Sequence, residues 1–208
     1  MPDFITKREL LERLLTETKV LQTAALRKAF SVIDRKDFVP PDYEVEAYED
    51  YPLPIGYGQT ISQPTTVAFM LGLLDVREGD LVLDIGSGSG WTTALLAALV
   101  GHTGSVLGIE RIPKLVECGR NNLAKYKFPH ASIAETNDER SRKGKSLYNK
   151  ILVSAAADEI PQEFIDRLSP GGTMVIPIND AVVKIMKDES TNITTQEFPG
   201  FVFVPLVQ

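Results

Sequence analysis

Apolar residues recur at helical spacing near the start of the chain, between Lys7 and Ile33, with charged residues between them. Because positions three and four apart share one face of a helix, this segment predicts two short amphipathic helices. The pattern dissolves after Asp34, where prolines and glycines as far as Ser62 exclude long regular elements. A long irregular segment in a compact chain is usually functional or mobile.

A different pattern begins at Asp80, where short apolar runs alternate with segments of helical spacing. This alternation is typical of a parallel sheet whose strands are joined by crossover helices. The expected helices are Pro64–Leu74, Trp91–Val100, Pro113–Tyr126 and Ile160–Leu168. The expected strands are Leu81–Ile85, Ser105–Ile109, Ala131–Ala134, Lys150–Ser154 and, after a tight turn at Pro170-Gly171-Gly172, Thr173–Ile176.

The end of the chain predicts antiparallel strands at the edge of that sheet, at Ala181–Lys187, Ile193–Thr195 and Val202–Leu206. The fold class is therefore α/β. We expect a Rossmann-like, doubly wound, mostly parallel sheet with an antiparallel C-terminal edge strand and an N-terminal helical extension. A single domain would span residues 1–208, with a helical cap and loop in 1–75 and the sheet in 76–208.

Composition narrows the class of protein. The chain has 208 residues, 43% of them hydrophobic, and no apolar run approaches the roughly 18–20 residues of a membrane helix, so we expect a cytoplasmic protein. Cys118 is the single cysteine and there are two histidines, which excludes zinc-finger spacing but not carboxylate-bound ions. A net charge of −6 gives no global electrostatic reason to expect nucleic acid binding.

The candidate chemistry begins in the glycine loop, Asp84–Gly90, which ends an apolar strand and opens a helix. Glycines there let the backbone approach a ligand closely, which favours a nucleotide-like cofactor. A dinucleotide fingerprint counted from Gly86 needs its third glycine at the position of Trp91. Glu110 closes the next strand, where a carboxylate can accept hydrogen bonds from ribose hydroxyls. Because Glu110 would suit NAD as well as another ribose-containing cofactor, NAD binding stays open as the weaker alternative.

The compact pattern of Gly86, Gly88 and Gly90, with an acid two residues before it, resembles motif I of class I S-adenosylmethionine-dependent methyltransferases. The resemblance implies S-adenosylmethionine as cofactor, S-adenosylhomocysteine as product and no metal. Asp84 would help to hold the ammonium group of the cofactor, directly or through water. The residues that we expect to bind the cofactor are Gln59, Thr60, Ile61, Asp84, Gly86, Ser87, Gly88, Gly90, Glu110, Arg111, Asn137 and Asp138.

Sequence stretches outside the glycine loop are more specific. They are Asp34–Pro40, Tyr48–Asp50, Leu53–Ser62 with Pro64, Ile109–Arg111, Ala155–Ala157, Glu159–Pro161, Leu168–Gly172 and Phe203–Leu206. With them, the chain from about Leu26 to Val207 resembles the protein-L-isoaspartate O-methyltransferase family. In that family the loop containing Thr-Ile-Ser covers the cofactor, and its serine is the active-site residue, here Ser62.

The resemblance implies a monomer that acts on isoaspartyl-containing proteins and peptides, with Tyr57, Thr60, Ser62 and Val204 at the substrate. The nucleophile is then the substrate's own α-carboxylate, which is ionised at neutral pH, so no strong general base is needed. Ser62 would position that carboxylate by hydrogen bonding. The alternative interpretation is that Ser62 only caps the helix that starts at Pro64.

Three departures from the family pattern keep other functions open. The family's acid in a Gly-Asp-Gly turn, which holds the adenine amino group, corresponds to Asn137 or Asp138, and its histidine after Ser-x-Pro is Thr65. The run 139–145 is unusually basic and predicts a solvated loop. The alternatives are a class I methyltransferase that acts on another carboxylate, a small molecule or RNA, and a cofactor-binding protein with weak activity.

Overall fold

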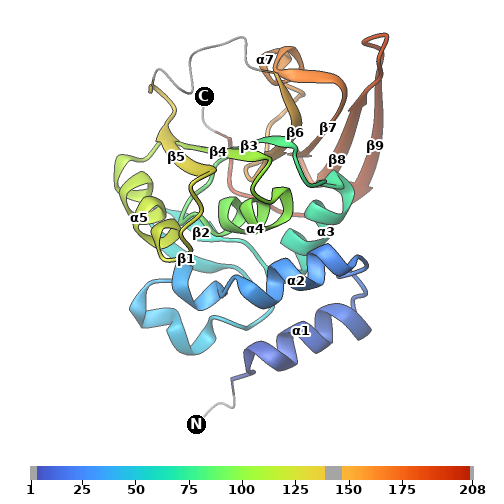
Figure 1. Ribbon diagram of the computed structural model, residues 1–208. Coiled ribbons are helices and arrows are strands. Elements are labelled where there is room, and N and C mark those ends of the chain that lie inside the picture. The colour runs from blue at the N-terminus through green and yellow to red at the C-terminus, as the bar shows by residue number, and fades with distance from the viewer. Residues whose placement is uncertain (1–3, 139–146, 207–208) are drawn as a thin grey trace.

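The computed structural model describes residues 4–138 and 147–206, and its centre is a seven-stranded sheet (Figure 1). The strands are β3 (Leu81–Ile85), β4 (Ser105–Glu110), β5 (Ala131–Glu135), β6 (Tyr148–Val153), β7 (Leu168–Ile178), β8 (Ala181–Lys187) and β9 (Ile193–Pro199). Their order is β5-β4-β3-β6-β7-β8-β9. The first five strands of this order pair in parallel and the last two pair antiparallel, which confirms the predicted α/β class.

Helices cover both faces of the sheet. They are α3 (Pro64–Leu74), α4 (Trp91–Val100) and α5 (Pro113–Ala124) on one face and α7 (Gln162–Asp166) on the other. Alternate residues of each strand therefore enter two separate cores, as Val82 packs with α4 while Leu83 packs with Phe164 of α7. Every residue of α4 except Ala98 is buried, because another helical layer lies outside it.

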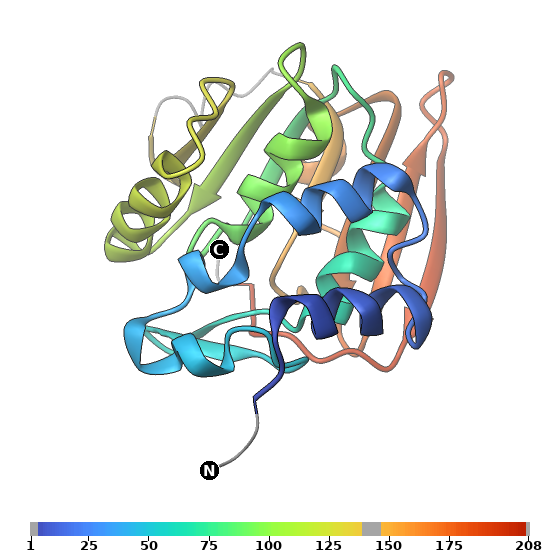
Figure 2. The ribbon, with the colours of Figure 1, turned by 60° about the horizontal axis from the view of Figure 1, so that its bottom comes forward.

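That outer layer is the N-terminal extension, which is formed by α1 (Lys7–Thr16) and α2 (Ala24–Val32). Figure 2 shows α2 lying across α3 and α4, with α1 packed beside α2 and α3. Helix α1 begins with a capping box, in which Thr6 and Glu9 satisfy each other's backbone N–H groups. The two amphipathic helices predicted from the hydrophobic pattern are confirmed.

The segment between α2 and α3 contains only short elements, as the prolines and glycines predict. Two 3-10 turns, η1 (Arg35–Phe38) and η2 (Pro41–Glu46), are followed by β1 (Leu53–Gly56) and β2 (Gln59–Ile61). The two strands form an antiparallel hairpin, and its turn is built from three residues with positive φ, which are Gly56, Tyr57 and Gly58. Residues 47–62 are called the hairpin segment below.

Two predictions for the C-terminal part are wrong. Pro170-Gly171-Gly172 is not a turn before a strand but lies inside β7 as part of a bulge, because pairing with β6 passes from Leu168 with Tyr148 to Thr173 with Lys150. Val202–Leu206 is not an antiparallel edge strand. The chain turns at Gly200, where φ is +97°, and leaves the sheet edge, so that Pro205 makes an isolated parallel bridge to Ala156.

Several boundaries also differ from the predictions. Helices α5 and α7 are shorter than expected, while β6 starts at Tyr148 and β9 extends to Pro199. The basic run 139–145 lies outside the described residues. Within residues 4–138 and 147–206, no helix combines the length and apolar character that crossing a membrane requires. The division at residue 75 stays a prediction.

Candidate active site

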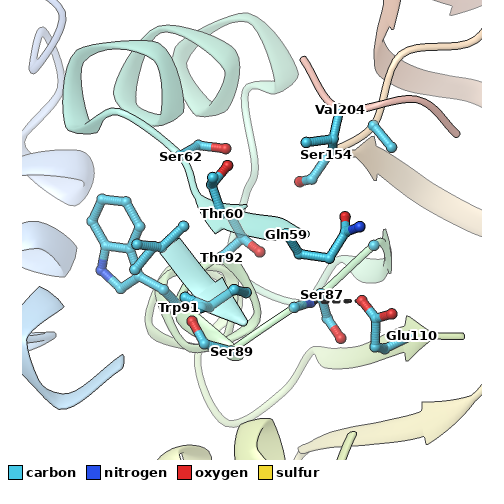
Figure 3. Close-up of a pocket in the computed structure, with 15 residues that line it drawn as sticks. Gln59, Thr60, Ser62, Ser87, Ser89, Trp91, Thr92, Glu110, Ser154 and Val204 are labelled. Atoms are coloured by element: carbon cyan, nitrogen blue, oxygen red, sulfur yellow. Dashed lines mark hydrogen bonds between the residues drawn. The ribbon is translucent and has the colours of Figure 1, made fainter. Parts of the chain in front are cut away.

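A pocket opens at the carboxyl ends of β3 and β6, where two adjacent parallel strands lead to opposite sides of the sheet (Figure 3). Such a switch point is where open α/β sheets bind ligands. Five separate parts of the chain line the pocket: the hairpin segment, the glycine loop with the start of α4, the end of β4, and the segments after β6 and β9. The lining residues are Ile55, Gln59, Thr60, Ile61, Ser62, Gly86, Ser87, Gly88, Ser89, Trp91, Thr92, Glu110, Ser154, Ala155 and Val204.

The glycine loop forms the floor of this pocket. Gly86, Gly88 and Gly90 all have positive φ, of +80°, +51° and +91°. A Cβ atom at Gly88 would lie 3.1 Å from Cδ1 of Ile55, across the pocket wall. A Cβ atom at Gly90 would instead lie 3.0 Å from the carbonyl oxygen of Gly119. Gly88 therefore keeps the pocket open, while Gly90, which does not line the pocket, lets α4 approach α5.

Glu110 is held rigidly at the end of β4. It is 7% exposed, and its Oε2 accepts a hydrogen bond from the N–H of Gly88 at 3.1 Å. Its Oε1 accepts from the N–H groups of Arg111 and Ile112, both at 2.9 Å. An ionised carboxylate has about four lone-pair sites, so Glu110 keeps acceptor capacity for hydroxyl groups of a ligand. Arg111 contributes its backbone here, while its side chain is exposed and lies outside the pocket lining.

Asp84 lies behind the glycine loop and is fully buried. Its Oδ2 accepts hydrogen bonds from Thr92 at 2.8 Å and from Thr93 at 2.6 Å, whereas its Oδ1 is buried without a partner among the described residues. Loss of water around the carboxylate raises the pKa of Asp84 to about 6, although the two threonines partly oppose this shift. Asp84 does not line the pocket itself. Its hydrogen-bond partner Thr92 does, so Asp84 is linked to the pocket through Thr92.

The hairpin segment forms the opposite wall. Thr60 lies in β2 and Ser62 follows that strand directly. Both line the pocket together with Ser154 and Val204 (Figure 3). Ser62 does not cap α3, because the N-cap residue of that helix is Gln63. The carboxylate of Asp50 instead accepts from the backbone N–H of Thr65 at 2.9 Å and from its hydroxyl at 2.7 Å. The capping interpretation of Ser62 is therefore wrong, and its side chain belongs to the pocket.

Other predicted residues divide between the pocket and its surroundings. Val204 reaches the lining because the chain after β9 crosses the carboxyl ends of the strands, where the N–H of Ala156 donates to the carbonyl of Val204 at 2.8 Å. Tyr57 is 62% exposed at the tip of the hairpin and lies outside the lining. Asn137 and Asp138 follow β5 and also lie outside it, although both make contacts elsewhere.

Sequence reasoning missed part of the pocket as a site. The lining residues absent from the predicted site are Ile55, Ser89, Trp91, Thr92, Ser154 and Ala155. Ser154 follows β6 directly, and its N–H donates to the carbonyl of Ile85 at 2.9 Å. The rule that ligands bind beyond the carboxyl ends of adjacent strands would have found it.

The pocket offers hydrogen-bonding groups rather than metal ligands. Within the described part of the chain, no group of three or more histidine, cysteine, aspartate or glutamate side chains is placed to hold a metal ion. The side-chain oxygen of Ser87 and Nε1 of Trp91 are buried without partners among the described residues, and both residues line the pocket. Buried polar atoms of this kind suit a polar organic ligand.

Comparison with solved structures supports the architecture over the whole chain. The crystal structure of a Plasmodium falciparum protein assigned as a protein-L-isoaspartate O-methyltransferase, in complex with S-adenosyl-L-homocysteine, matches with a TM-score of 0.84 and 25% identity, covering 98% of this chain and 99% of that chain. A second solved protein-L-isoaspartate O-methyltransferase matches with a TM-score of 0.81 and 23% identity, covering 98% of this chain and 66% of its own.

Comparison of sequences gives the same assignment. Protein-L-isoaspartate O-methyltransferase 2 of Archaeoglobus fulgidus is 42% identical over 208 residues, covering 98% of this chain and 94% of the relative. The protein-L-isoaspartate O-methyltransferase of Methanothrix thermoacetophila is 39% identical and covers 94% of each chain. The family model described as protein-L-isoaspartate(D-aspartate) O-methyltransferase matches residues 5–208. The chain therefore belongs to the protein-L-isoaspartate O-methyltransferase family.

Proposed function

We propose that this protein transfers a methyl group from S-adenosylmethionine to the α-carboxylate of L-isoaspartyl residues in damaged proteins and peptides. The observation that carries the proposal is one pocket shared by the hairpin segment, with Ser62, and the glycine loop, with Glu110. The first resembles the family's substrate loop and the second its cofactor motif. Their meeting in one cavity is what transfer between two bound molecules requires.

The residues of the pocket fit the cofactor. Gly86 and Gly88 let the backbone of the loop come close to a ligand, and the acceptor oxygens of Glu110 suit a pair of ribose hydroxyls. The unpartnered oxygen of Ser87 supplies a further polar contact. When bound, S-adenosylmethionine supplies an electrophilic sulfonium methyl group. We assign the adenine amino group to Asn137 or Asp138, which follow β5 on the same edge of the sheet.

The chain's own part in the reaction is to place the substrate. An α-carboxylate is ionised at neutral pH, so it needs no base to become a nucleophile. The hydroxyl of Ser62 donates a hydrogen bond that orients it, and the apolar side chains of Ile55 and Val204 limit the water around it. Tyr57, at the exposed tip of the hairpin, meets residues of the peptide beside the isoaspartyl group.

Further parts of the proposal concern the state of the protein. Methyl transfer needs no metal, the active form is a monomer, and the protein works in the cytoplasm on polypeptides rather than on nucleic acid. The first statement follows from the chemistry of the carboxylate and the last from the net charge of −6. The monomer is what the family resemblance implies, and the location is the expectation drawn from the apolar runs of the sequence. Activity that survives chelation by EDTA and elutes at monomer size is the expected result.

The test measures cofactor binding and methyl transfer separately. Calorimetric titration with S-adenosylmethionine should show one site, and methyl transfer should occur to an isoaspartyl peptide but not to the aspartyl peptide of the same sequence. Binding of the cofactor without methylation of the isoaspartyl peptide would contradict the proposal. It would then favour a methyltransferase with another acceptor or a cofactor-binding protein.

A further inference from the structure

Arg35, the first residue of η1, is buried at the base of the hairpin segment with 2% of its surface exposed. Its two terminal nitrogens donate hydrogen bonds only to backbone carbonyls, while Nε is buried without a partner among the described residues. Nη1 donates to Ala47 at 2.8 Å and to Glu49 at 3.1 Å. Nη2 donates to Tyr51 at 3.0 Å, to Ser62 at 3.1 Å and, more weakly, to Ile61 at 3.5 Å.

These carbonyls belong to the two ends of the hairpin segment. The chain enters the hairpin through residues 47–51 and leaves it through Ile61 and Ser62. Because the donors of a guanidinium lie in one plane at fixed angles, a single side chain holds the two ends in one relative placement. A flexible ammonium group cannot bond five carbonyls in this way, since it has three donors.

The positive charge of Arg35 is stabilised by the backbone carbonyls of the hairpin segment. A buried cation is costly unless it is paired or fully hydrogen-bonded. Burial lowers the pKa of Arg35 to about 10, with the charge of Asp50 opposing the shift, so the guanidinium is protonated at neutral pH. Among the ion pairs of the described residues, none includes Arg35. The carbonyl dipoles of the hairpin segment therefore replace a carboxylate as its partners.

Besides its hydrogen bonds, the guanidinium packs against the cofactor side of the pocket. Its central carbon lies 5.3 Å from the ring centroid of Trp91, within the range of a cation–π contact. Trp91 follows the glycine loop directly, lines the pocket and is packed edge-on by Phe30 at 5.8 Å. Arg35 thus lies between the carbonyl of Ser62 and the first residue of α4.

We propose that Arg35 is a positioning residue for methyl transfer, which fixes the Ser62 backbone against Trp91 so that the substrate wall and the cofactor floor keep one relative placement. This inference rests on the proposed function. It predicts that the shape of the guanidinium matters beyond its charge, and that its loss affects turnover more than binding of the cofactor, because Glu110 and the glycine loop are held by the sheet.

The test compares Arg35→Lys with Arg167→Lys. Arg167 is a matched control, since its guanidinium carbon also lies 5.3 Å from an aromatic centroid, that of Tyr148, outside the pocket. Arg35→Lys should lower kcat for an isoaspartyl peptide by about 30-fold, while the affinity for S-adenosylhomocysteine changes by less than about threefold. Arg167→Lys should leave both within about twofold.

Trp91 gives a readout that is independent of activity, because it is the chain's single tryptophan. Its fluorescence in the free protein should shift to longer wavelength in Arg35→Lys, as water reaches the ring, and should be unchanged in Arg167→Lys. This readout also separates the two proposals. A wild-type protein that does not methylate the peptide contradicts the proposed function, while an unchanged Trp91 emission in Arg35→Lys contradicts the positioning role of Arg35.

A double-mutant cycle with Ser62→Ala tests whether Arg35 acts through Ser62. If it does, the effect of Ser62→Ala on kcat should be several-fold smaller in the Arg35→Lys background than in the wild type. Fully multiplicative losses would overturn the proposal. Should Arg35→Lys fail to fold, Trp91→Phe and Trp91→Leu provide the test, measured at saturating cofactor. The ring of Phe should retain most of kcat and Leu should not, and equal kcat values would overturn the proposal.

Discussion

The glycine loop and the hairpin segment present backbone to the same pocket but are held in place by different means. The N–H groups of Gly86 and Ser87 donate to the carbonyl of Ile109 on the neighbouring strand, and Glu110 holds Gly88. Within the described residues, the two strands of the hairpin segment pair only with each other. The segment is fixed by buried apolar residues and by side-chain contacts, among them those of Arg35 and Asp50. One wall is therefore an extension of the sheet, while the other depends on side-chain contacts.

This difference indicates how each wall should respond to mutation. Changes in the glycine loop should act on cofactor binding, because its backbone is the binding surface and the sheet prevents it from moving away. Changes at Ser62 and in the contacts that hold it should act on turnover more than on cofactor binding, because the glycine loop and Glu110 keep their own supports when Ser62 shifts. Four predictions test this division, in order of decreasing effect.

Gly88→Val should weaken binding of S-adenosylhomocysteine by about 1000-fold, or about 4 kcal/mol. Gly88 has a φ of +51°, which valine tolerates poorly, and the new side chain would meet Ile55 in the pocket. Calorimetric titration measures the loss. Gly72→Ala is the control, because a Cβ there comes no closer than 4.0 Å to Leu26. Equal affinities in both variants would show that the loop does not form the cofactor floor.

Stability should depend on pH through Asp84 on the cofactor side. Its folded pKa of about 6 lies above its unfolded value, so the native state binds more protons, and stability falls as pH rises between about 4 and 6. Replacement by asparagine removes this penalty. Relative to wild type, Asp84→Asn should gain about 2 kcal/mol of unfolding free energy between pH 4 and pH 7.

Urea denaturation at several pH values measures this gain, with Asp166→Asn as an exposed control. The absolute stability of Asp84→Asn also reflects its altered hydrogen bonds to Thr92 and Thr93, so the pH dependence of the difference is the relevant quantity. Parallel pH profiles for Asp84→Asn and wild type would contradict the burial of an ionisable group at this position.

Ser62→Ala should lower kcat for an isoaspartyl peptide by about 30-fold, which corresponds to about 2 kcal/mol for a hydrogen bond to a charged group. The affinity for S-adenosylhomocysteine should change by less than about twofold, since the glycine loop is untouched. Initial rates at saturating cofactor measure the first quantity and calorimetry the second. Ser31→Ala, on the exposed side of α2, is the control. A loss of cofactor affinity with normal kcat would reverse the roles of the two walls.

Thr65→Val tests the weakest of these effects. It removes the hydroxyl that donates to Asp50 at 2.7 Å but keeps the backbone N–H that also donates to Asp50. The unfolding free energy should fall by about 1 kcal/mol, and cofactor affinity should not change. Thr16→Val is the control, because it removes an exposed hydrogen bond from the Thr16 hydroxyl to the backbone carbonyl of Glu12. It should lower the unfolding free energy by less. If cofactor affinity fell as well, the two walls would not be independent.

Much of the fold could be predicted because its signals are local. The strand Leu81–Ile85 and the helices Pro64–Leu74 and Trp91–Val100 lie at their expected bounds. Apolar periodicity, glycine and proline act within a few residues of the element they define. The errors at Pro170–Gly172 and Val202–Leu206 arose where long-range pairing decided the outcome. Strand β7 begins at Leu168 because Leu168 pairs with Tyr148, and residues 169–172 form a bulge before pairing resumes at Thr173.

The candidate site could be predicted only in part, for the same reason. The glycine loop, Glu110 and Ser62 carry local motifs and all contribute residues to the pocket lining. Ser154 carries no motif, and its place depends on the pairing of β6 with β3. Arg35 lay within a matching sequence stretch, but its link to a carbonyl 27 residues away could not be seen in the sequence.

The sequence by itself determined the class of fold, the position of the glycine loop and the family, because these depend on residue types at short, regular spacings. Only the tertiary structure decided which residues meet: Arg35 with Ser62 and Trp91, and Val204 with the pocket. Such meetings depend on how strands pair and where buried polar groups find partners. Because most buried donors in a folded protein are paired with an acceptor, those partners are set by the packed chain as a whole and not by neighbours in sequence.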